Sequence, residues 1–190
     1  MSSYYRIADH IINIINNGNK LSTLSLLPSF VPFKCDNLLN EKILFKLTID
    51  QSVTLIESDK VHHIRAFDTG NGDIVVDRLA NGGYQFLIKN IQGENCVLLI
   101  TNKDFSDCRC RLYGTDNMQR FGLNNALMLV MAFAGSSKDT ILVHASLVRH
   151  NNYGYAFIAK SGTGKSTQVS LWLKYIPNCD LMNDDNPVIR

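Results

Sequence analysis

The chain has 190 residues, of which 45% are hydrophobic and 19% are charged, and its formal net charge is +2. This is the composition of a globular protein with one domain or two small ones, and the balanced charge gives no indication of a nucleic-acid partner. The N-terminus has no charged segment followed by an apolar run, and the most apolar stretch, residues 126–135, is too short to span a bilayer. We therefore expect neither nucleic acid nor a membrane among its partners.

The five cysteines predict free thiols, because an odd number without a recognisable pairing pattern gives no disulfide framework. Free thiols and the lack of a predicted signal peptide favour the reducing cytoplasm as the location. Cys108 and Cys110 lie on one face of a predicted strand. We expect both to be buried, since no second pair of ligands stands at a spacing suited to zinc.

Residues 1–118 predict an N-terminal antiparallel β-rich domain. The isoleucines of residues 1–18 fit either a short helix or a strand, and the sequence leaves these alternatives open. The two prolines of LLPSFVPF predict an extended connector. Alternating runs from Lys42 to Gly114 then predict several antiparallel strands, with hairpin turns at Gly-Asn-Gly and at IQGEN.

Residues 119–190 predict the start of an α/β domain, so the whole chain is expected to be of the α+β or α/β class. The predicted elements are a helix over residues 121–137, strands over 140–150 and 155–160, a helix over 166–176, and a strand from 179 into an acidic turn. Only about four residues join the two strands, so these strands must be antiparallel. In most P-loop proteins the strand before the loop has parallel neighbours, and the hairpin therefore predicts a mixed sheet here.

The segment AKSGTGKST lies between the second of these strands and the following helix. The P-loop (Walker A) pattern is Gly, any four residues, and Gly-Lys-Ser/Thr; here Ala159 takes the first position, and Gly164, Lys165 and Ser166 complete the pattern. Gly162 and Gly164 let the backbone turn successive N–H groups toward one anion at the positive end of the helix. A glycine-rich turn that only caps a helix is the alternative, and the strand–loop–helix context favours phosphate binding.

We expect ATP and Mg²⁺ to be the ligands of this loop. Lys165 is placed to reach the β and γ phosphates, and the Ser166 hydroxyl is placed to bind Mg²⁺. The predicted nucleotide-binding residues are Ser161, Gly162, Thr163, Gly164, Lys165, Ser166 and Thr167.

Asp184 and Asp185 follow the next apolar stretch and supply the carboxylates that a P-loop enzyme needs. One carboxylate could hold Mg²⁺ while the other takes the proton of a substrate hydroxyl. Taken alone, the pair could be a solvated Asx turn before Pro187, and its place after the loop, a helix and a strand favours a function. His144 lies on the strand that folds back toward the loop, although a lone strand histidine is more often structural.

In three motifs, VHASLV, GYAFIAKSGTGKST and NDDNPV, the chain resembles the HPr kinase/phosphorylase family and its relatives in the phosphoenolpyruvate carboxykinase-like superfamily. The resemblance covers about residues 138–190 and implies a kinase-like P-loop domain. The roles that it implies are phosphate binding by Lys165 and the amides of Gly162–Lys165, Mg²⁺ binding by Ser166, a place near the metal for Asp185, proton acceptance by Asp184, and orientation or charge balance of the acidic pair by His144. It thus implies catalytic roles for Asp184, His144 and Lys165, and metal-binding roles for Ser166 and Asp185.

Three function classes stay open. The favoured one is a kinase that transfers the γ-phosphoryl group of ATP to a hydroxyl of a protein, peptide or small molecule. The others are a carboxykinase-type enzyme, which would need an arginine cluster that the sequence does not display, and a nucleotide-binding regulator without turnover.

The family's substrate loop and C-terminal helices have no counterpart in the sequence. We therefore expect the chain to be the N-terminal part of a longer kinase-like protein. By itself it should bind nucleotide weakly without turnover. The open sheet edge predicts that the chain either self-associates through this edge or has lost an ordered remainder.

Overall fold

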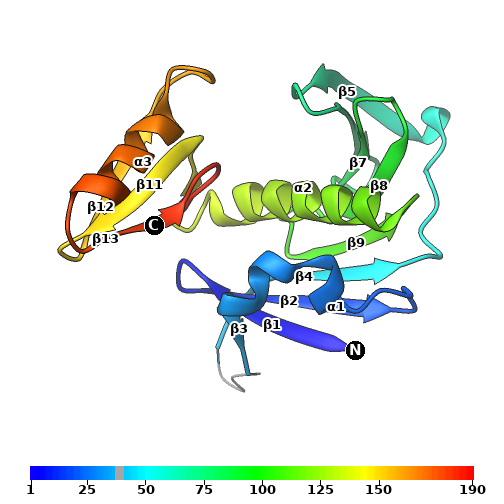
Figure 1. Cartoon of the computed structure of the whole chain (residues 1–190). Coiled ribbons are helices and arrows are strands. Elements are labelled where there is room, and N and C mark those ends of the chain that lie inside the picture. The colour runs from blue at the N-terminus through cyan, green and yellow to red at the C-terminus, as the bar shows by residue number, and fades with distance from the viewer. Residues whose placement is uncertain (37–40) are drawn as a thin grey trace. The chain divides into compact units, whose positions relative to one another are not determined.

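The computed structural model describes residues 1–36 and 41–190, which form two compact units, Met1–Lys138 and Asp139–Arg190. The fold is mixed α/β, with a large mixed sheet and few helices (Figure 1). The strands of the first unit are β1 (Ser2–Ile7), β2 (His10–Asn17), β3 (Lys34–Cys35), β4 (Ile43–Asp50), β5 (Val61–Asp68), β6 (Asp73–Leu79), β7 (Tyr84–Lys89), β8 (Asn95–Thr101) and β9 (Asp107–Leu112). Its helices are α1 (Thr23–Leu26), the 3₁₀ turns η1 (Pro28–Phe33) and η2 (Ser58–Lys60), and α2 (Asp116–Gly135).

The nine strands of the first unit form one sheet in the order β3-β1-β2-β4-β9-β8-β7-β6-β5. The predicted hairpins β5–β6 and β7–β8 are confirmed, with Asp68 opposite Asp73 at the first turn. The predicted antiparallel arrangement holds for part of the sheet only, because β4 pairs in parallel with both β2 and β9. Parallel neighbours require a long connection. The chain provides one through α1, η1 and β3 before β4, and another through β5–β8 before β9.

Residues 1–18, which the sequence left undecided, form the hairpin β1–β2. Ile11, Ile12 and Ile14 are all buried, so both faces of β2 are covered. For this reason the sequence shows neither the alternation of a half-exposed strand nor the period of a helix. The connector that follows is helical and not extended. Ser22 caps α1 through the N–H of Ser25, and Pro28 lies in the first turn of η1, where a missing N–H is tolerated.

Helix α2 packs on the sheet of the first unit and contacts β4, β7, β8 and β9. Figure 1 shows it between β4 and the β7–β8 part of the sheet. The buried residues of α2 include Leu123, Ala126, Leu127 and Val130, which form its apolar face against the strands. The boundary between the units therefore follows Lys138, whereas the sequence suggested a division between residues 118 and 119. No helix among the described residues, α2 included, is long and apolar enough to cross a membrane.

Glycine is required in α2 where the helix approaches strand β8. A Cβ at Gly122 would lie 2.9 Å from the carbonyl carbon and oxygen of Cys96, which are backbone atoms that cannot rotate away. We expect Gly122→Ala to destabilise the first unit by roughly 1–3 kcal/mol, because the helix or the strand must shift. Urea unfolding measures the change. Helix propensity alone predicts the opposite sign, since alanine favours a helix by about 1 kcal/mol over glycine.

Asn124→Ala is the matched control for this substitution. Asn124 is on the same helix and exposed, and it donates only to the carbonyl of Arg120 within the helix. We expect a change within about 0.5 kcal/mol. A Gly122→Ala variant that is as stable as the wild type, or more stable, would contradict the close approach.

All five cysteines are free thiols, as the sequence predicts. Cys108 and Cys110 on β9 are buried, which confirms their predicted place in the core. Burial raises the pKa of the Cys108 thiol to about 12. Such a thiol stays protonated at neutral pH and is a poor metal ligand or nucleophile.

The second unit contains β10 (Ile141–Leu142), β11 (Ala145–His150), β12 (Tyr153–Ile158), α3 (Lys165–Tyr175), β13 (Cys179–Asn183) and β14 (Val188–Ile189). Its main sheet has the order β12-β11-β13, and β10 pairs with β14. All these pairs are antiparallel, so the prediction of a mixed sheet is wrong for the part of this unit that the structure describes. Strands β12 and β13 run in the same direction, but β11 lies between them.

Helix α3 covers one face of this small sheet. The Trp172 ring lies 5.0 Å from the ring of Tyr155 and 5.4 Å from that of Phe157, measured between centroids. Val169 is buried on the same helix. These aromatic contacts hold α3 against β12, the two elements that the loop joins.

Candidate functional site

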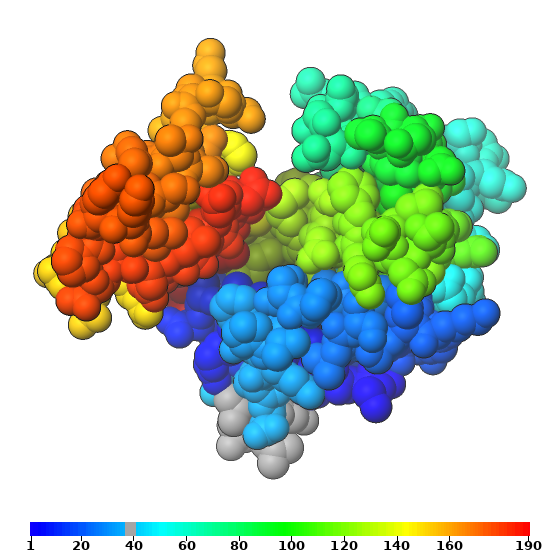
Figure 2. Space-filling view, viewed as in Figure 1, coloured from blue at the N-terminus to red at the C-terminus, as the bar shows by residue number. Residues whose placement is uncertain are grey.

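The loop from Ala159 to Gly164 joins β12 to α3, as the sequence predicts. Gly162 and Gly164 have φ angles of 79° and 93°, in the left-handed region. A Cβ at either position would meet nothing within 4 Å, so the backbone conformation and not crowding requires glycine there. Lys160 closes the turn, because its carbonyl accepts from the Thr163 hydroxyl at 2.7 Å. The loop, in orange, projects from the rest of its unit (Figure 2).

Helix α3 begins at Lys165 without a capping side chain, since its N-cap is Gly164. The other two α-helices in the described part of the chain are capped, α1 by Ser22 and α2 by Thr115. The first N–H groups of an α-helix have no acceptor within the helix. The N-terminus of α3 therefore offers uncapped amides, together with the positive end of the helix dipole, to an anion.

Lys165 is half-buried and folded back over the loop. Its Nζ donates to the carbonyl oxygen of Ala159 at 3.0 Å and of Lys160 at 3.4 Å, and it lies 3.1 Å from Nε2 of His144. The ammonium has three hydrogens, and these three groups can accept all of them. The charge of Lys165 is thus held at the loop without a carboxylate partner among the described residues.

His144 links the loop to the acidic turn. Its Nδ1 lies 3.3 Å from Oδ1 of Asp185, while its Nε2 faces Lys165. A neutral imidazole that donates from Nδ1 to the carboxylate and accepts at Nε2 from the ammonium satisfies both contacts. The three side chains form one hydrogen-bonded series from Lys165 through His144 to Asp185.

Asp185 is held by its neighbours in the NDDN motif. Its N–H donates to Oδ1 of Asn183 at 2.9 Å, and its Oδ2 accepts from Nδ2 of Asn186 at 2.8 Å. The Asp184 side chain is exposed and makes no hydrogen bond or ion pair with any described residue. The two adjacent carboxylates are both exposed and differ in their partners, since one is bonded to His144 and the other to no described residue.

The backbone also connects the acidic turn to the segment around His144. The Val143 N–H donates to the Pro187 carbonyl at 3.2 Å, and the Ala145 N–H donates to the Asp185 carbonyl at 3.0 Å. These bonds continue the register in which Leu142 lies opposite Val188 and Leu147 opposite Asn183. Residues 141–147 and 183–189 thus run side by side in a single antiparallel register, even though β10 and β11 are separate strands.

The structure brings together three of the predicted residues, namely Lys165, His144 and Asp185. Asp184 lies in the same turn without joining the bonded series. The other predicted residues occupy the exposed loop and the first turn of α3: Ser161, Gly162, Thr163, Gly164, Ser166 and Thr167. Sequence reasoning missed Asn183 and Asn186, although the pattern Asn-Asp-Asp-Asn places an amide on each side of the acidic pair.

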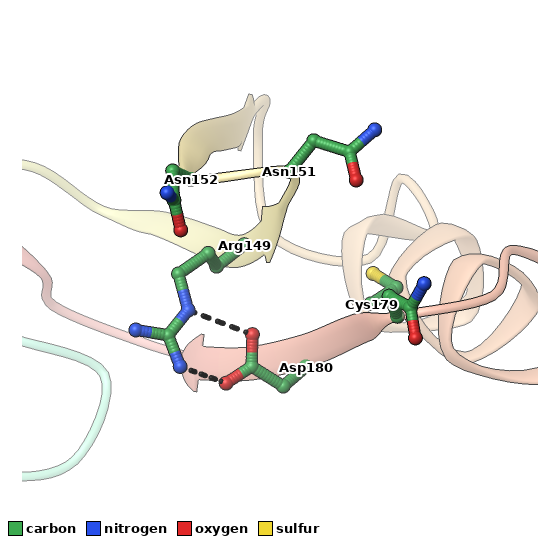
Figure 3. Close-up of a pocket in the computed structure, with 6 residues that line it drawn as sticks. Arg149, Asn151, Asn152, Cys179 and Asp180 are labelled. Carbon is green, nitrogen blue, oxygen red and sulfur yellow. Dashed lines mark hydrogen bonds and ion pairs between the residues drawn. The ribbon is translucent and has the colours of Figure 1, made fainter.

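A separate open hollow lies at the other end of β11, beside the hairpin turn (Figure 3). Arg149 makes two bonds to Asp180 across the strands, Nε to Oδ1 at 3.0 Å and Nη2 to Oδ2 at 2.5 Å. Hydrogen bonding to Arg149 lowers the pKa of Asp180. The guanidinium is already paired, and none of the predicted site residues lines this hollow.

Comparisons with protein-family models, with curated proteins and with solved structures found no match to the chain. The interpretation of the site therefore depends on its geometry and on its sequence motifs. Function has to be argued from the named side chains and from the chemistry that they can perform.

Proposed function

We propose that the second unit binds Mg·ATP through the loop at residues 159–167 and serves phosphoryl transfer to a hydroxyl group, as the resemblance to HPr kinase-related proteins implies. The observation that carries the proposal is the bonded series Lys165–His144–Asp185, which joins the P-loop lysine to the acidic turn. Each motif alone has a structural alternative. Their meeting at one place, across three separate sequence segments, is what a catalytic arrangement requires.

The loop suits a phosphate chain. Its left-handed glycines leave open space where a side chain would otherwise project, and the uncapped amides of Lys165, Ser166 and Thr167 need acceptors. The acceptors of Lys165 are two carbonyls and an imidazole, which are neutral and can be exchanged for charged phosphate oxygens. We infer that Lys165 leaves the loop carbonyls and donates to the phosphates.

The same residues suit Mg²⁺ when a nucleotide supplies part of the coordination. Among residues 1–36 and 41–190, no three His, Cys, Asp or Glu side chains gather into a metal site. Mg²⁺ usually takes one or two protein oxygens and completes its shell with phosphates and water. The exposed Ser166 hydroxyl and the Asp185 carboxylate are the proposed protein ligands.

The acidic turn divides the remaining roles. Bound Mg·ATP would supply the γ-phosphoryl group. Asp184, exposed and without a partner in its turn, would take the proton of the acceptor hydroxyl. His144 would keep Asp185 oriented by donating to its carboxylate. The identity of the hydroxyl-bearing substrate, protein or small molecule, is left open by this proposal.

A ligand series tests the binding site. We expect ATP and ADP to raise the unfolding temperature of the second unit in the presence of Mg²⁺, and adenosine, which has no phosphates, to leave it unchanged. At a ligand concentration of 100 times Kd the stabilisation is about 2.7 kcal/mol. Chelation of Mg²⁺ should reduce the ATP effect.

The outcomes of this series separate the function classes. Equal stabilisation by adenosine and ATP would overturn phosphate binding by the loop. Release or transfer of labelled phosphate would favour the kinase over the nucleotide-binding regulator. Turnover that depends on oxaloacetate would identify a carboxykinase.

A further inference from the structure

Strand β12 is an outer strand, and β11 is its only neighbour among the described strands. Its six residues, Tyr-Gly-Tyr-Ala-Phe-Ile, carry no charge. Tyr153 is 70% exposed and Ile158 67% exposed, and they extend from opposite faces of the sheet. An exposed, uncharged, apolar edge of this kind is a template for pairing with another strand.

The other outer strands of the described sheets are protected against such pairing. Strands β3, β10 and β14 have two residues each. The longer outer strands contain charged residues, among them Arg65 in β5 and Asp180 in β13. Short strands and charged side chains are the usual protection of a sheet edge. The absence of both in β12 distinguishes it from every other described edge.

The hairpin turn determines which backbone groups of β12 face outward. Asn151 and Asn152 both have positive φ angles, 48° and 64°, as in a two-residue type I′ turn. In such a turn the closing residues, His150 and Tyr153, are joined by a hydrogen bond. Bonded and non-bonded pairs then alternate along β11 and β12. The N–H and C=O groups of Gly154, Ala156 and Ile158 therefore point away from β11, toward the open edge.

We propose that β12 is a dimerisation edge, at which two copies of this chain pair antiparallel about a two-fold axis at Ala156. In this register Ala156 lies opposite the partner's Ala156, and Gly154 lies opposite the partner's Ile158. All the outward N–H and C=O groups of the strand are then bonded, and the smallest side chain faces the largest aliphatic one. On the face that carries α3, Tyr155 lies opposite the partner's Phe157, an aromatic cross-strand pair.

A second copy fits this edge without a clash between helices. The register keeps the same face of both sheets on one side, so both copies of α3 lie on that side. Helix α3 contacts β11 as well as both of its neighbours, β12 and β13. With β11 of each copy under its helix, the helices are separated by about three strand spacings, or roughly 14 Å, compared with about 8–10 Å for packed helices. The exposed aromatic side chains occupy the space between them.

Sedimentation equilibrium of the whole chain over roughly 5–200 µM tests this proposal. The paired surface is small, so we expect a weak dimer whose mass rises with concentration toward twice that of the monomer. Ala156→Pro removes an outward N–H and leaves the bonds to β11 in place, because proline is tolerated on the open side of an edge strand. This variant should stay monomeric, and so should Ala156→Lys, which places a charge at the edge.

Two controls accompany these variants. Ala156→Val keeps the N–H and suits a strand, so it should associate like the wild type. Lys165→Ala should also dimerise, because the proposed edge does not depend on nucleotide binding. The fluorescence of Trp172, the only tryptophan, reports whether the second unit of each variant is folded.

A wild-type chain that stays monomeric over the whole concentration range would overturn the proposal. So would association of Ala156→Lys as strong as that of the wild type. Growth beyond a dimer would also overturn it, since the two-fold pairing closes on itself.

Discussion

Replacing Lys165 with alanine is expected to weaken the binding of Mg·ATP by roughly ten- to a hundred-fold, the value of one or two hydrogen bonds to charged groups. Where phosphate transfer is observed, its rate should fall by on the order of 10²-fold or more. The physical reason is that, among the described residues, Lys165 is the single lysine or arginine whose charged group is bonded to the loop, through Ala159, Lys160 and the neighbouring His144. Isothermal titration with ATP measures the affinity.

Lys160→Ala is the matched control for Lys165→Ala. Lys160 lies on the same loop and carries the same charge, but its ammonium has no partner among the described residues and is exposed. We expect less than a threefold loss of affinity for this variant, as for an exposed charge in water. An equal loss of ATP affinity in both variants would show that only the net charge of the loop matters. Unchanged affinity in Lys165→Ala would show that ATP does not use this loop.

Asparagine at position 184 and asparagine at position 185 are expected to have different effects. Where phosphate transfer is observed, Asp184→Asn should abolish it, with a loss of 10²-fold or more by the usual value of a general base, while Mg·ATP binding stays nearly intact. The Asp184 side chain makes no contact that the amide would break. Asp185→Asn should instead raise the Mg²⁺ concentration needed for ATP binding, because it removes a proposed metal ligand and the anionic acceptor of His144.

ATP affinity as a function of Mg²⁺ concentration and release of labelled phosphate from [γ-³²P]ATP measure the two effects separately. The two variants have the same net charge and the same type of substitution, so each is the control for the other. The reverse pattern, with Asp184→Asn changing the Mg²⁺ requirement and Asp185→Asn changing only transfer, would exchange the two roles.

Short-range features were predictable because local residues determine them. The strands from Lys42 to Gly114 and the hairpin turns follow from alternation and glycine placement. The strand, loop and helix around Lys165 follow from the P-loop pattern, because the residues of that pattern are adjacent in the sequence. The approach of His144 to the loop was also accessible, because a short turn forces the strand before it to fold back.

Long-range pairing was not predictable from the same patterns. Nothing local in β4 indicates that its neighbours are β2 and β9, both in parallel, because alternation describes the faces of a strand and not the identity of its neighbours. Helix α2 likewise has an apolar face that either sheet could have covered. The pairing of β10 with β14 was not predicted, because a strand of two residues is too short to show an alternating pattern.

The position of His144 depends on the number of residues in two facing segments, because residues 141–147 are bonded in register with residues 183–189. Deleting one residue on either side of this pairing would shift the two facing segments by one position, so that Ala145 would no longer lie opposite Asp185. Every site residue would remain in the sequence, yet the imidazole and the carboxylate would be displaced by about one residue of extended chain, roughly 3.3 Å, which is enough to break their contact. Substitutions keep the backbone bonds and can be tolerated one at a time, whereas a lost residue here must be matched by a lost residue in the facing segment. The turn at Asn151 and Asn152 lies outside this register, so additional residues there would lengthen the hairpin and leave the site unchanged.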